Sequence, residues 1–362
     1  MELNQLLEIL KHTPAMQSKQ AIAHCFSTNI VLGNIALGNI VSDNVTCHVD
    51  SLDSLYAYPG DDTAAVSLNG QYILHACEGM LPNFVTHYPY FAGWSAVMAN
   101  ISDIAAMGGR ALSVVNSLWH TSNESAQQLM QGMQDACRAY GVPLVGGHTH
   151  LGAAYQPALS VAIQGMARKL LSVLHVKPQQ KILIALNLQG QFHPDTTYWK
   201  CFEQVSGRIL QSQIALLPQL AEENLAYAAR DISNAGILGS LLMLLEGTAS
   251  GARINLDAIP KPDDVEWFQW LQIFPSFGFL LTADADKCEE IIRLFHSQDI
   301  ACTVIGETNS SGVITVQQQE QSSIFWDFHR QIFTGFCYAN LLKKRALEQS
   351  QSKPIQIETK SR

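Results

Sequence analysis

The chain has 362 residues, of which 47% are hydrophobic and 15% are charged, and its formal net charge is −9. This composition is that of a globular protein with room for two ordinary domains, so a disordered or fibrous chain is excluded. The negative charge argues against a protein that grips the nucleic-acid backbone, because such a protein needs clustered positive charge.

The cysteine usage and the N-terminal pattern predict a cytoplasmic protein. The 8 cysteines are scattered without a C-x-x-C pair, as free thiols in a reducing compartment usually are. The N-terminal segment is amphipathic and lacks the basic start and the long apolar core of a signal peptide. The longest apolar run, over 236–247, is too short to span a bilayer. We therefore expect a small-molecule partner, with no nucleic-acid and no membrane partner.

The apolar pattern from residue 70 onward predicts a first block of mixed α and β structure that ends near residue 170. Its expected elements are a strand over 71–79, a helix over 91–109, a strand over 111–119, a helix over 123–141, and strands over 142–147 and 157–169. The second of these helices has Asn123 as its expected N-cap and Gly141 as its stop signal.

A second mixed block follows, which makes the predicted fold class α/β (α+β) with two domains. Its expected elements are a strand over 181–190, an insertion over 190–201, a helix over 207–224, a strand-turn-helix over 228–247, strands over 252–256 and 277–283, a helix over 284–297, and strands over 301–306 and 312–316. Residues 322–347 are expected to form one long terminal helix, followed by a polar tail.

The first block is rich in acids that have few cations nearby. Residues 48–150 contain eight aspartates and glutamates but only two arginines. Two carboxylates about 4 Å apart repel by roughly 4 kcal/mol at an effective dielectric constant near 20, so a fold that gathers several must protonate them or bind a cation. Asp61 and Asp62, behind Pro59-Gly60, are therefore candidate Mg²⁺ ligands. The alternative is that they cap and solvate a turn.

Further acids and amides are expected at the ends of the predicted elements. Asp103 falls in the last turn of a helix, where the partial negative charge disfavours a carboxylate, and Asn100 lies on the same helical face. Glu78 ends an apolar strand and is placed at the rim of a sheet, where α/β proteins commonly build sites. Each of these residues taken alone is more often a solvated surface group.

The segment LVGGHTH (144–150) ends another apolar strand. Gly146 and Gly147 would let the backbone approach a phosphate closely, and Thr149 can donate a hydrogen bond to it. Alternatively, His148 and His150 share one face of an extended strand and form a transition-metal pair. A surface histidine remains the commonest explanation of such a pattern.

Taken in order, the segments PGDDTAAV, HACEGMLPNFV, ANISDIAAMGG, LVGGHTH and ARDISNAGI resemble the ATP-dependent superfamily of aminoimidazole ribonucleotide (AIR) synthetase, thiamine monophosphate kinase, selenophosphate synthetase and the hydrogenase-maturation dehydratase, in particular its AIR synthase-related branch. The resemblance implies an N-terminal domain that dimerises through its strands, a C-terminal α/β domain, and ATP held by Mg²⁺ near the dimer interface. The resulting division is an extension with helix and loop over 1–57, an ATP- and Mg²⁺-binding domain over 58–170, a C-terminal domain over 171–318, and a terminal helix with a flexible tail over 319–362.

Carried over by position, the resemblance makes Asp61, Asp62 and Asp103 metal ligands and places Asn100 in the nucleotide site. Two positions depart from the superfamily's pattern. Glu78 stands where thiamine monophosphate kinase has an aspartate, and it can still ligate Mg²⁺. His148 stands where the pattern usually reads G-G-D-T; it is a poor ligand for a hard ion but can supply an acid-base group that titrates near neutrality.

The segment DISNAGI matches the kinase's D-L-S-D-G turn and keeps Asp231 and Ser233, with Asn234 in place of the second acid. We expect Asp231 to be catalytic and Ser233, Asn234 and Phe277 to face the acceptor; the alternative is a helix capped by Ser233 or Asn234. Lys19 could reach a transferring phosphate, although a plain surface lysine is the alternative.

The sequence therefore predicts an enzyme that uses ATP and Mg²⁺ to phosphorylate or activate a small molecule, chiefly by positioning and charge neutralisation. Two other functions stay open: a nucleotide-binding regulatory or scaffold protein without turnover, and a transition-metal hydrolase that uses His148 and His150. The predicted oligomer is a homodimer.

Overall fold

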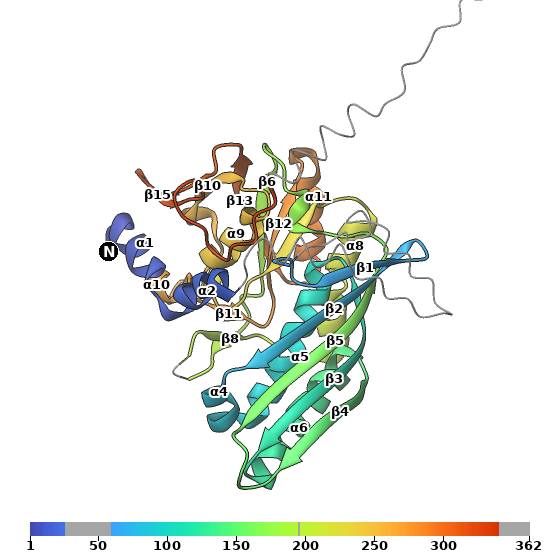
Figure 1. The fold of residues 1–362 in the computed structure, drawn as a ribbon. Helices are drawn as coiled ribbons and strands as arrows, with labels where there is room; N and C mark the ends of the chain where they lie inside the picture. Colours follow the sequence, from blue (N-terminus) through green and yellow to red (C-terminus); the bar gives the residue numbers. More distant parts are fainter. Residues whose placement is uncertain (26–58, 195, 340–362) are drawn as a thin grey trace, which may run out of the picture.

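The structure, a computed structural model, describes residues 1–25, 59–194 and 196–339 (Figure 1). The loop part of the predicted N-terminal extension and the predicted tail lie outside these residues. The described chain forms two large sheets, and each sheet has its own hydrophobic core. The mixed α/β class with two domains is confirmed.

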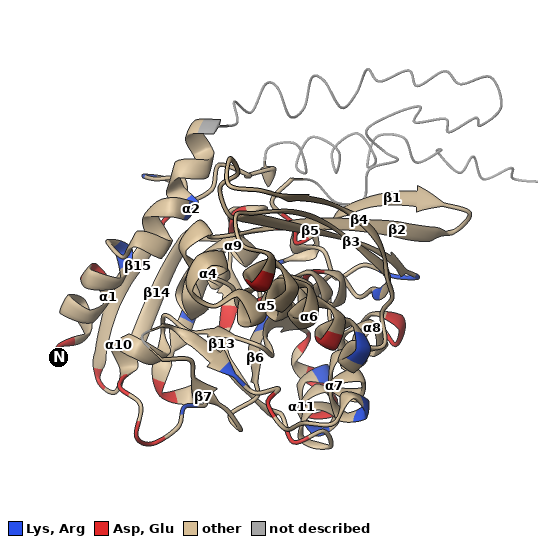
Figure 2. Cartoon of the chain, turned by 90° about the horizontal axis from the view of Figure 1, so that it is seen from below, with Lys and Arg blue, Asp and Glu red and all other residues tan. Residues whose placement is uncertain are grey.

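The first sheet has five strands in the order β1-β2-β5-β3-β4, and only the β3–β4 pair is parallel. The strands are β1 (Ala64–Leu68), β2 (Gln71–Met80), β5 (Ala158–Ala167), β3 (Arg110–His120) and β4 (Leu144–Leu151). Helices α5 (Pro89–Ala106) and α6 (Asn123–Tyr140) lie on one side of this sheet, as Figure 2 shows, and the short α4 (Pro82–His87) precedes α5.

Period-2 alternation explains why one face of this sheet is covered. Leu159, Val161 and Ile163 of β5 are buried under the helices, whereas their sequence neighbours point to the other face. Several large apolar side chains on these strands and the adjoining loops are exposed: Val66, Leu68, Leu112, Val115, Val145, Leu151, Tyr155 and Met166.

The second sheet has seven strands in the order β15-β14-β10-β13-β6-β12-β9, and only the β10–β14 pair is parallel. The strands are β15 (Gln321–Asp327), β14 (Val313–Gln318), β10 (Gly251–Asn255), β13 (Ala301–Asn309), β6 (Lys181–Leu186), β12 (Gly278–Ala283) and β9 (Ala228–Asp231). The helices of this half are α7 (Gly207–Ile214), α8 (Leu216–Glu222), α9 (Gly236–Glu246), α10 (Trp267–Trp270) and α11 (Cys288–His296).

The predicted insertion forms part of a small third sheet of β11 (Phe274–Pro275), β8 (Tyr198–Lys200) and β7 (Gln191–Phe192). His193 of this segment stacks on Phe91 of α5, with 4.7 Å between the ring centroids. The insertion therefore packs against the first domain through aromatic contacts.

The N-terminal residues belong to the second core. Helix α1 (Leu3–Lys11) buries Leu3, Leu6, Leu7 and Leu10 there, and the Leu3 N–H donates to Gln321 Oε1 of β15 at 3.0 Å. Helix α2 (Pro14–Cys25) follows and buries Met16 in the same core. Among the described residues, no helix has both the length and the apolar character needed to cross a bilayer.

The prediction of one long helix over 322–347 is wrong. Residues 321–327 instead form β15, which pairs antiparallel with β14 around a tight turn, and residues 328–338 contain turns and irregular backbone. Pairing with the edge of an existing sheet outweighed the helical periodicity of this segment. Two smaller details also differ, because Ser122 and not Asn123 caps α6, and the predicted helix over 207–224 is divided into α7 and α8.

Candidate functional site

Three carboxyl groups from distant parts of the chain converge between the two domains. One oxygen each of Asp62, Asp103 and Asp231 lies within 4.8 Å of the others. Asp62 comes from the loop before β1, Asp103 from the last turn of α5, and Asp231 from the end of β9. We call these three residues the acidic cluster.

The acidic cluster is buried and electrostatically strained. The exposed fraction is 7% for Asp103 and 4% for Asp231, and Asp103 Oδ2 has no hydrogen-bond partner among the described residues. Two charges 4.8 Å apart repel by about 3.5 kcal/mol at an effective dielectric constant near 20. Burial raises the pKa of Asp103 well above its usual value, and the charges of Asp231 and Glu78 add to the effect. Burial, followed by the charge of Asp62, raises the pKa of Asp231 to about 8.

The donor set of the acidic cluster fits a hard divalent cation. All three side chains offer carboxylate oxygens as ligands. Asp103 Oδ2 is buried and accepts no hydrogen bond from the described residues. A bound cation would relieve the repulsion between the three carboxylates. A hard divalent cation such as Mg²⁺ prefers oxygen ligands of this kind. In the described part of the chain, no other group of three or more His, Cys, Asp or Glu side chains has this geometry.

Arg230, which the sequence reasoning missed, compensates part of the negative charge. Its guanidinium lies 3.0 Å from Asp62 Oδ1 and also donates to the backbone oxygen of Gly60. Burial lowers the pKa of Arg230, but Asp62 and Asp231 raise it by more, so the guanidinium stays charged. The backbone N–H of Asp231 donates to Asp62 Oδ2 at 3.2 Å. The sequence did offer one indication of this role, because Arg230 directly precedes the predicted site residue Asp231.

Glu78 and Lys19 lie within electrostatic reach of the cluster. Burial raises the pKa of Glu78, the positive charge of Lys19 is the largest opposing influence, and the charge of Asp62 raises this pKa further. Lys19 also lowers the pKa of Asp62 and of Asp231, after the larger effects of burial and of Arg230. Helix α2 therefore brings Lys19 within electrostatic reach of the acids, and its contact with a phosphate stays a prediction.

Asp61 is adjacent to Asp62 in the sequence, but its carboxyl group makes hydrogen bonds outside the acidic cluster. Its carboxyl oxygens accept from Ser172 Oγ at 2.5 Å and from the backbone N–H of Val173 at 2.9 Å, at the start of the short 3-10 helix Val173–His175. Burial raises its pKa to about 7 in spite of these two hydrogen bonds. The structure thus brings only one of the two adjacent aspartates into the acidic cluster, and Asp61 instead joins the first domain to the connection that leads into the second.

Residues 146–149 do not join the acidic cluster within one chain. Gly146, Gly147, His148 and Thr149 lie on β4, at the opposite edge of the first sheet from β1. Four inter-strand steps correspond to about 19 Å. The Nε2 atoms of His148 and His150 lie 2.6 Å apart, and His150 stacks near Trp119. This distance fits a hydrogen bond between the rings, and no third metal-binding side chain joins them among the described residues.

Of the other predicted site residues, Asn100 is buried in the first domain, and Ser233 and Asn234 lie next to Asp231. Asn100 is fully buried, and its Nδ2 donates to the backbone oxygens of Ala96 and Val161, at 2.7 and 3.0 Å. Ser233 and Asn234 are half-buried in the turn after Asp231, and neither caps α9, whose N-cap is Ala235.

Phe277, which was expected from the sequence to face an acceptor, lies in the second core. Its exposed fraction is 5%, and it packs against Phe279 and Phe295, with centroid distances of 5.1 and 6.5 Å. The buried Phe277 ring stabilises the second core through the apolar area that it buries and its contacts with the other two rings.

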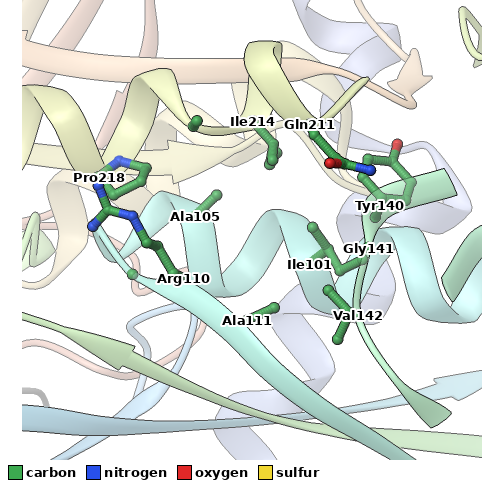
Figure 3. Close-up of a pocket in the computed structure, with 12 residues that line it drawn as sticks. Ile101, Ala105, Arg110, Ala111, Tyr140, Gly141, Val142, Gln211, Ile214 and Pro218 are labelled. Carbon is green, nitrogen blue, oxygen red and sulfur yellow. The ribbon is translucent and has the colours of Figure 1, made fainter. Parts of the chain in front are cut away.

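A separate cavity of about 210 Å³ lies between α5, α6 and the α7–α8 pair (Figure 3). Its walls are largely apolar, with Ile101, Val142 and Ile214 among the lining residues, and Arg110 and Gln211 contribute polar groups. Arg110 is already paired with Glu222, at 2.5 Å. The lining includes none of the acidic cluster, so this cavity is distinct from the candidate site.

The fold and the site define a two-domain α/β protein with a buried acidic site where the domains meet. Family models of the AIR synthase related protein match the chain over residues 60–167 for the N-terminal domain and 189–319 for the C-terminal domain. An uncharacterized protein of Synechocystis is 39% identical over 278 residues, which cover 76% of this chain and 86% of the relative. The chain therefore belongs to the AIR synthase-related family.

Other relatives extend this comparison. The selenide, water dikinase of Aeromonas hydrophila is 26% identical, and the match covers 72% of this chain and 79% of that enzyme. The structure of PurL of Thermotoga maritima complexed with ATP has a TM-score of 0.62 and 22% identity, and the match covers 72% of this chain and 44% of PurL. The structure of ThiL complexed with AMPPCP and TMP has a TM-score of 0.57 and 17% identity, with 74% of this chain and 91% of ThiL covered. These structures share the fold, and the chain spans less than half the length of that PurL.

Proposed function

We propose that the protein is an ATP- and Mg²⁺-dependent enzyme that phosphorylates or activates a small molecule. The observation that carries this proposal is the convergence of Asp62, Asp103 and Asp231 from both domains, with one buried oxygen of Asp103 left without a donor. Such a costly arrangement is expected where a fold holds a divalent cation. Relatives that are named as a dikinase or were solved with ATP and AMPPCP support the nucleotide assignment.

Each residue of the site has a proposed task. Asp62, Asp103 and Asp231 would hold Mg²⁺, which when bound neutralises charge on phosphate oxygens. Arg230 fixes the orientation of Asp62 through its ion pair. Lys19 supplies a positive charge on the side of α2, where it can stabilise a transferring phosphate. Ser233 and Asn234 lie in the half-buried turn beside Asp231 and would contact the acceptor.

We also propose a homodimer formed through the outer face of the first sheet. That face carries several exposed apolar side chains, among them Val66, Val115 and Met166, which a partner would cover. A second copy would also explain how Gly146, Gly147 and Thr149 could contact a nucleotide, because they lie about 19 Å from β1 within one chain. Sedimentation of the wild type and of Val115→Lys tests this point, since a dimeric wild type and a dissociated variant are expected.

Calorimetric titration with Mg²⁺ and a non-hydrolysable ATP analogue tests the main proposal. Asp103→Asn should weaken binding about tenfold or more, because it removes one charged ligand. Asp286→Asn removes an equally charged but exposed carboxylate and should bind like the wild type. Absence of binding by the folded wild-type protein would overturn the proposal.

Two further measurements separate the remaining alternatives. Tight nucleotide binding without turnover across a panel of metabolites would favour a regulatory or scaffold protein. Stoichiometric zinc or iron in the purified protein, lost on replacing His148 and His150, would favour a metal hydrolase. The contact between the two Nε2 atoms is the single observation behind that last alternative.

A further inference from the structure

A buried glutamate outside the acidic cluster anchors the C-terminal part of the described chain. Glu246 is the last residue of α9, and its exposed fraction is 2%. Its Oε1 accepts from the backbone N–H groups of Phe333 and Gly335 at 2.8 and 3.2 Å. Its Oε2 accepts from the backbone N–H and from Oγ1 of Thr334, at 2.9 and 2.6 Å. We call residues 328–338 the C-terminal strap.

The four hydrogen bonds fix the strap in one position. No Lys, Arg or His forms an ion pair with Glu246 in the described ranges, so donors from the strap satisfy both carboxyl oxygens. A buried acceptor that loses such donors pays a full desolvation penalty, and alternative positions of the strap are therefore unfavourable. The Phe333 ring reinforces this position, because it is fully buried and packs edge-on against Trp326 with 5.4 Å between centroids.

The far end of the strap contacts the loop that carries Asp62. Tyr338 Oη donates to the backbone oxygen of Pro59 at 2.7 Å, and the Tyr338 N–H donates to the backbone oxygen of Gly247 at 2.8 Å. Phe336 lies so close to Gly60 that a Cβ at Gly60 would be 2.6 Å from Phe336 Cβ. The strap thus connects the end of α9 with Pro59 and Gly60.

We propose that Glu246 is a positioning residue for the acidic cluster, which acts through the strap on the loop from Pro59 to Asp62. The inference rests on the proposed Mg²⁺-nucleotide site for its functional meaning. Glu246 does not touch the acids itself; it holds the strap, and the strap holds the loop against β9 so that Asp62 meets Arg230 and Asp231. The role is geometric, because the hydrogen bonds of Glu246 go to the strap and the strap in turn contacts Pro59 and Gly60.

Two backbone amides report the position of the loop without any ligand. The N–H of Val173 donates to Asp61 Oδ1, and the N–H of Asp231 donates to Asp62 Oδ2. If the strap positions the loop, Glu246→Gln and Tyr338→Phe should raise hydrogen exchange at these two amides, by about tenfold and about threefold. Amides of β12 should exchange at the wild-type rate in both variants, which shows that the core remains folded.

Matched variants complete the experiment. Thr334→Val removes one hydrogen bond to Glu246 at nearly constant volume and should act like Tyr338→Phe. Tyr227→Phe removes an exposed hydroxyl that donates to Asp284 at 2.7 Å and should leave exchange at Val173 and Asp231 unchanged. Binding of the Mg²⁺-nucleotide analogue should weaken in the order of the exchange effects.

The outcomes separate the two proposals. Faster exchange at Val173 and Asp231 in Glu246→Gln and Tyr338→Phe supports the positioning role, even if the wild type binds no nucleotide and the proposed function fails. Wild-type exchange at both amides in Tyr338→Phe and Thr334→Val overturns the positioning role, even if nucleotide binds. If Glu246→Gln does not fold, the other two variants still decide the question.

Discussion

Metal binding to the acidic cluster should depend steeply on pH, because the carboxyl groups hold protons that the ion must displace. Burial and the charge of Asp62 raise the pKa of Asp231 to about 8. At pH 7 a group with that pKa is ionised in about one molecule in ten, so each unit of pH from 6 to 8 should tighten Mg²⁺ binding about tenfold, or about 1.4 kcal/mol. The contribution of Asp231 to this gain should level off above pH 8.

Calorimetry in buffers with different ionisation enthalpies measures the protons released. About one proton per ion is expected at pH 7 from Asp231, and Asp103, whose pKa is also raised, can add to it. Asp231→Asn should bind more weakly and lose most of this dependence, and Asp286→Asn should keep it. An affinity for Mg²⁺ that stays constant between pH 6 and 8, with no buffer dependence, would refute the electrostatic reasoning.

The same shift determines how the stability of the metal-free protein changes with pH. The folded-state pKa of Asp231 lies above the ordinary value of 3.8, so the folded protein binds more protons than the unfolded chain between about pH 4 and about pH 8. The free energy of unfolding should therefore fall as pH rises through this window, by up to about 1.4 kcal/mol per unit for one group. Added Mg²⁺ should restore it, and thermal unfolding with and without a chelator measures both effects.

Three substitutions test the surroundings of the cluster. Arg230→Met leaves buried Asp62 without its partner and should lower the free energy of unfolding of the metal-free protein by about 3–5 kcal/mol. Mg²⁺ should restore part of this loss. A loss below about 1 kcal/mol in denaturant unfolding would speak against a stabilising ion pair. Asp61→Asn should cost about 1–3 kcal/mol of stability but change Mg²⁺-nucleotide affinity far less than Asp103→Asn, and equal affinity losses would instead make Asp61 a ligand. Gly60→Ala should lower the unfolding temperature clearly, because φ is +106° and Phe336 fills the space, whereas Gly79→Ala meets open space and serves as the control.

Local patterns predicted most elements because burial on one face leaves a period in the sequence. The alternation in β5 and the glycine after α6 are examples, and Gly141 does end α6 in the left-handed conformation, with φ of +72°. The terminal segment shows the limit of this reasoning. Residues 321–327 carry aromatic and apolar side chains that suit a helix or a strand, and only the presence of β14 made the strand preferable.

Phe277 shows a related limit at the level of the site. The sequence reasoning expected this side chain to face the acceptor. The side chain lies in the core against Phe279 and Phe295, directly before β12, whose residues are all buried. Because both faces of this strand are covered, the sequence pattern alone does not tell which packing partners the Phe277 ring meets.

The sequence by itself marked Asp103 as a costly acid at the negative end of a helix, and the resemblance marked Asp231 as a site residue. Only the tertiary structure decided that Asp62 and not Asp61 meets them, that Arg230 pairs with Asp62, and that Glu246 holds the strap against the same loop. The physical reason is range. Propensity and periodicity act over a few neighbouring residues, whereas Asp62 and Asp231 are 169 positions apart and meet only because the two domains, each with its own core, pack together.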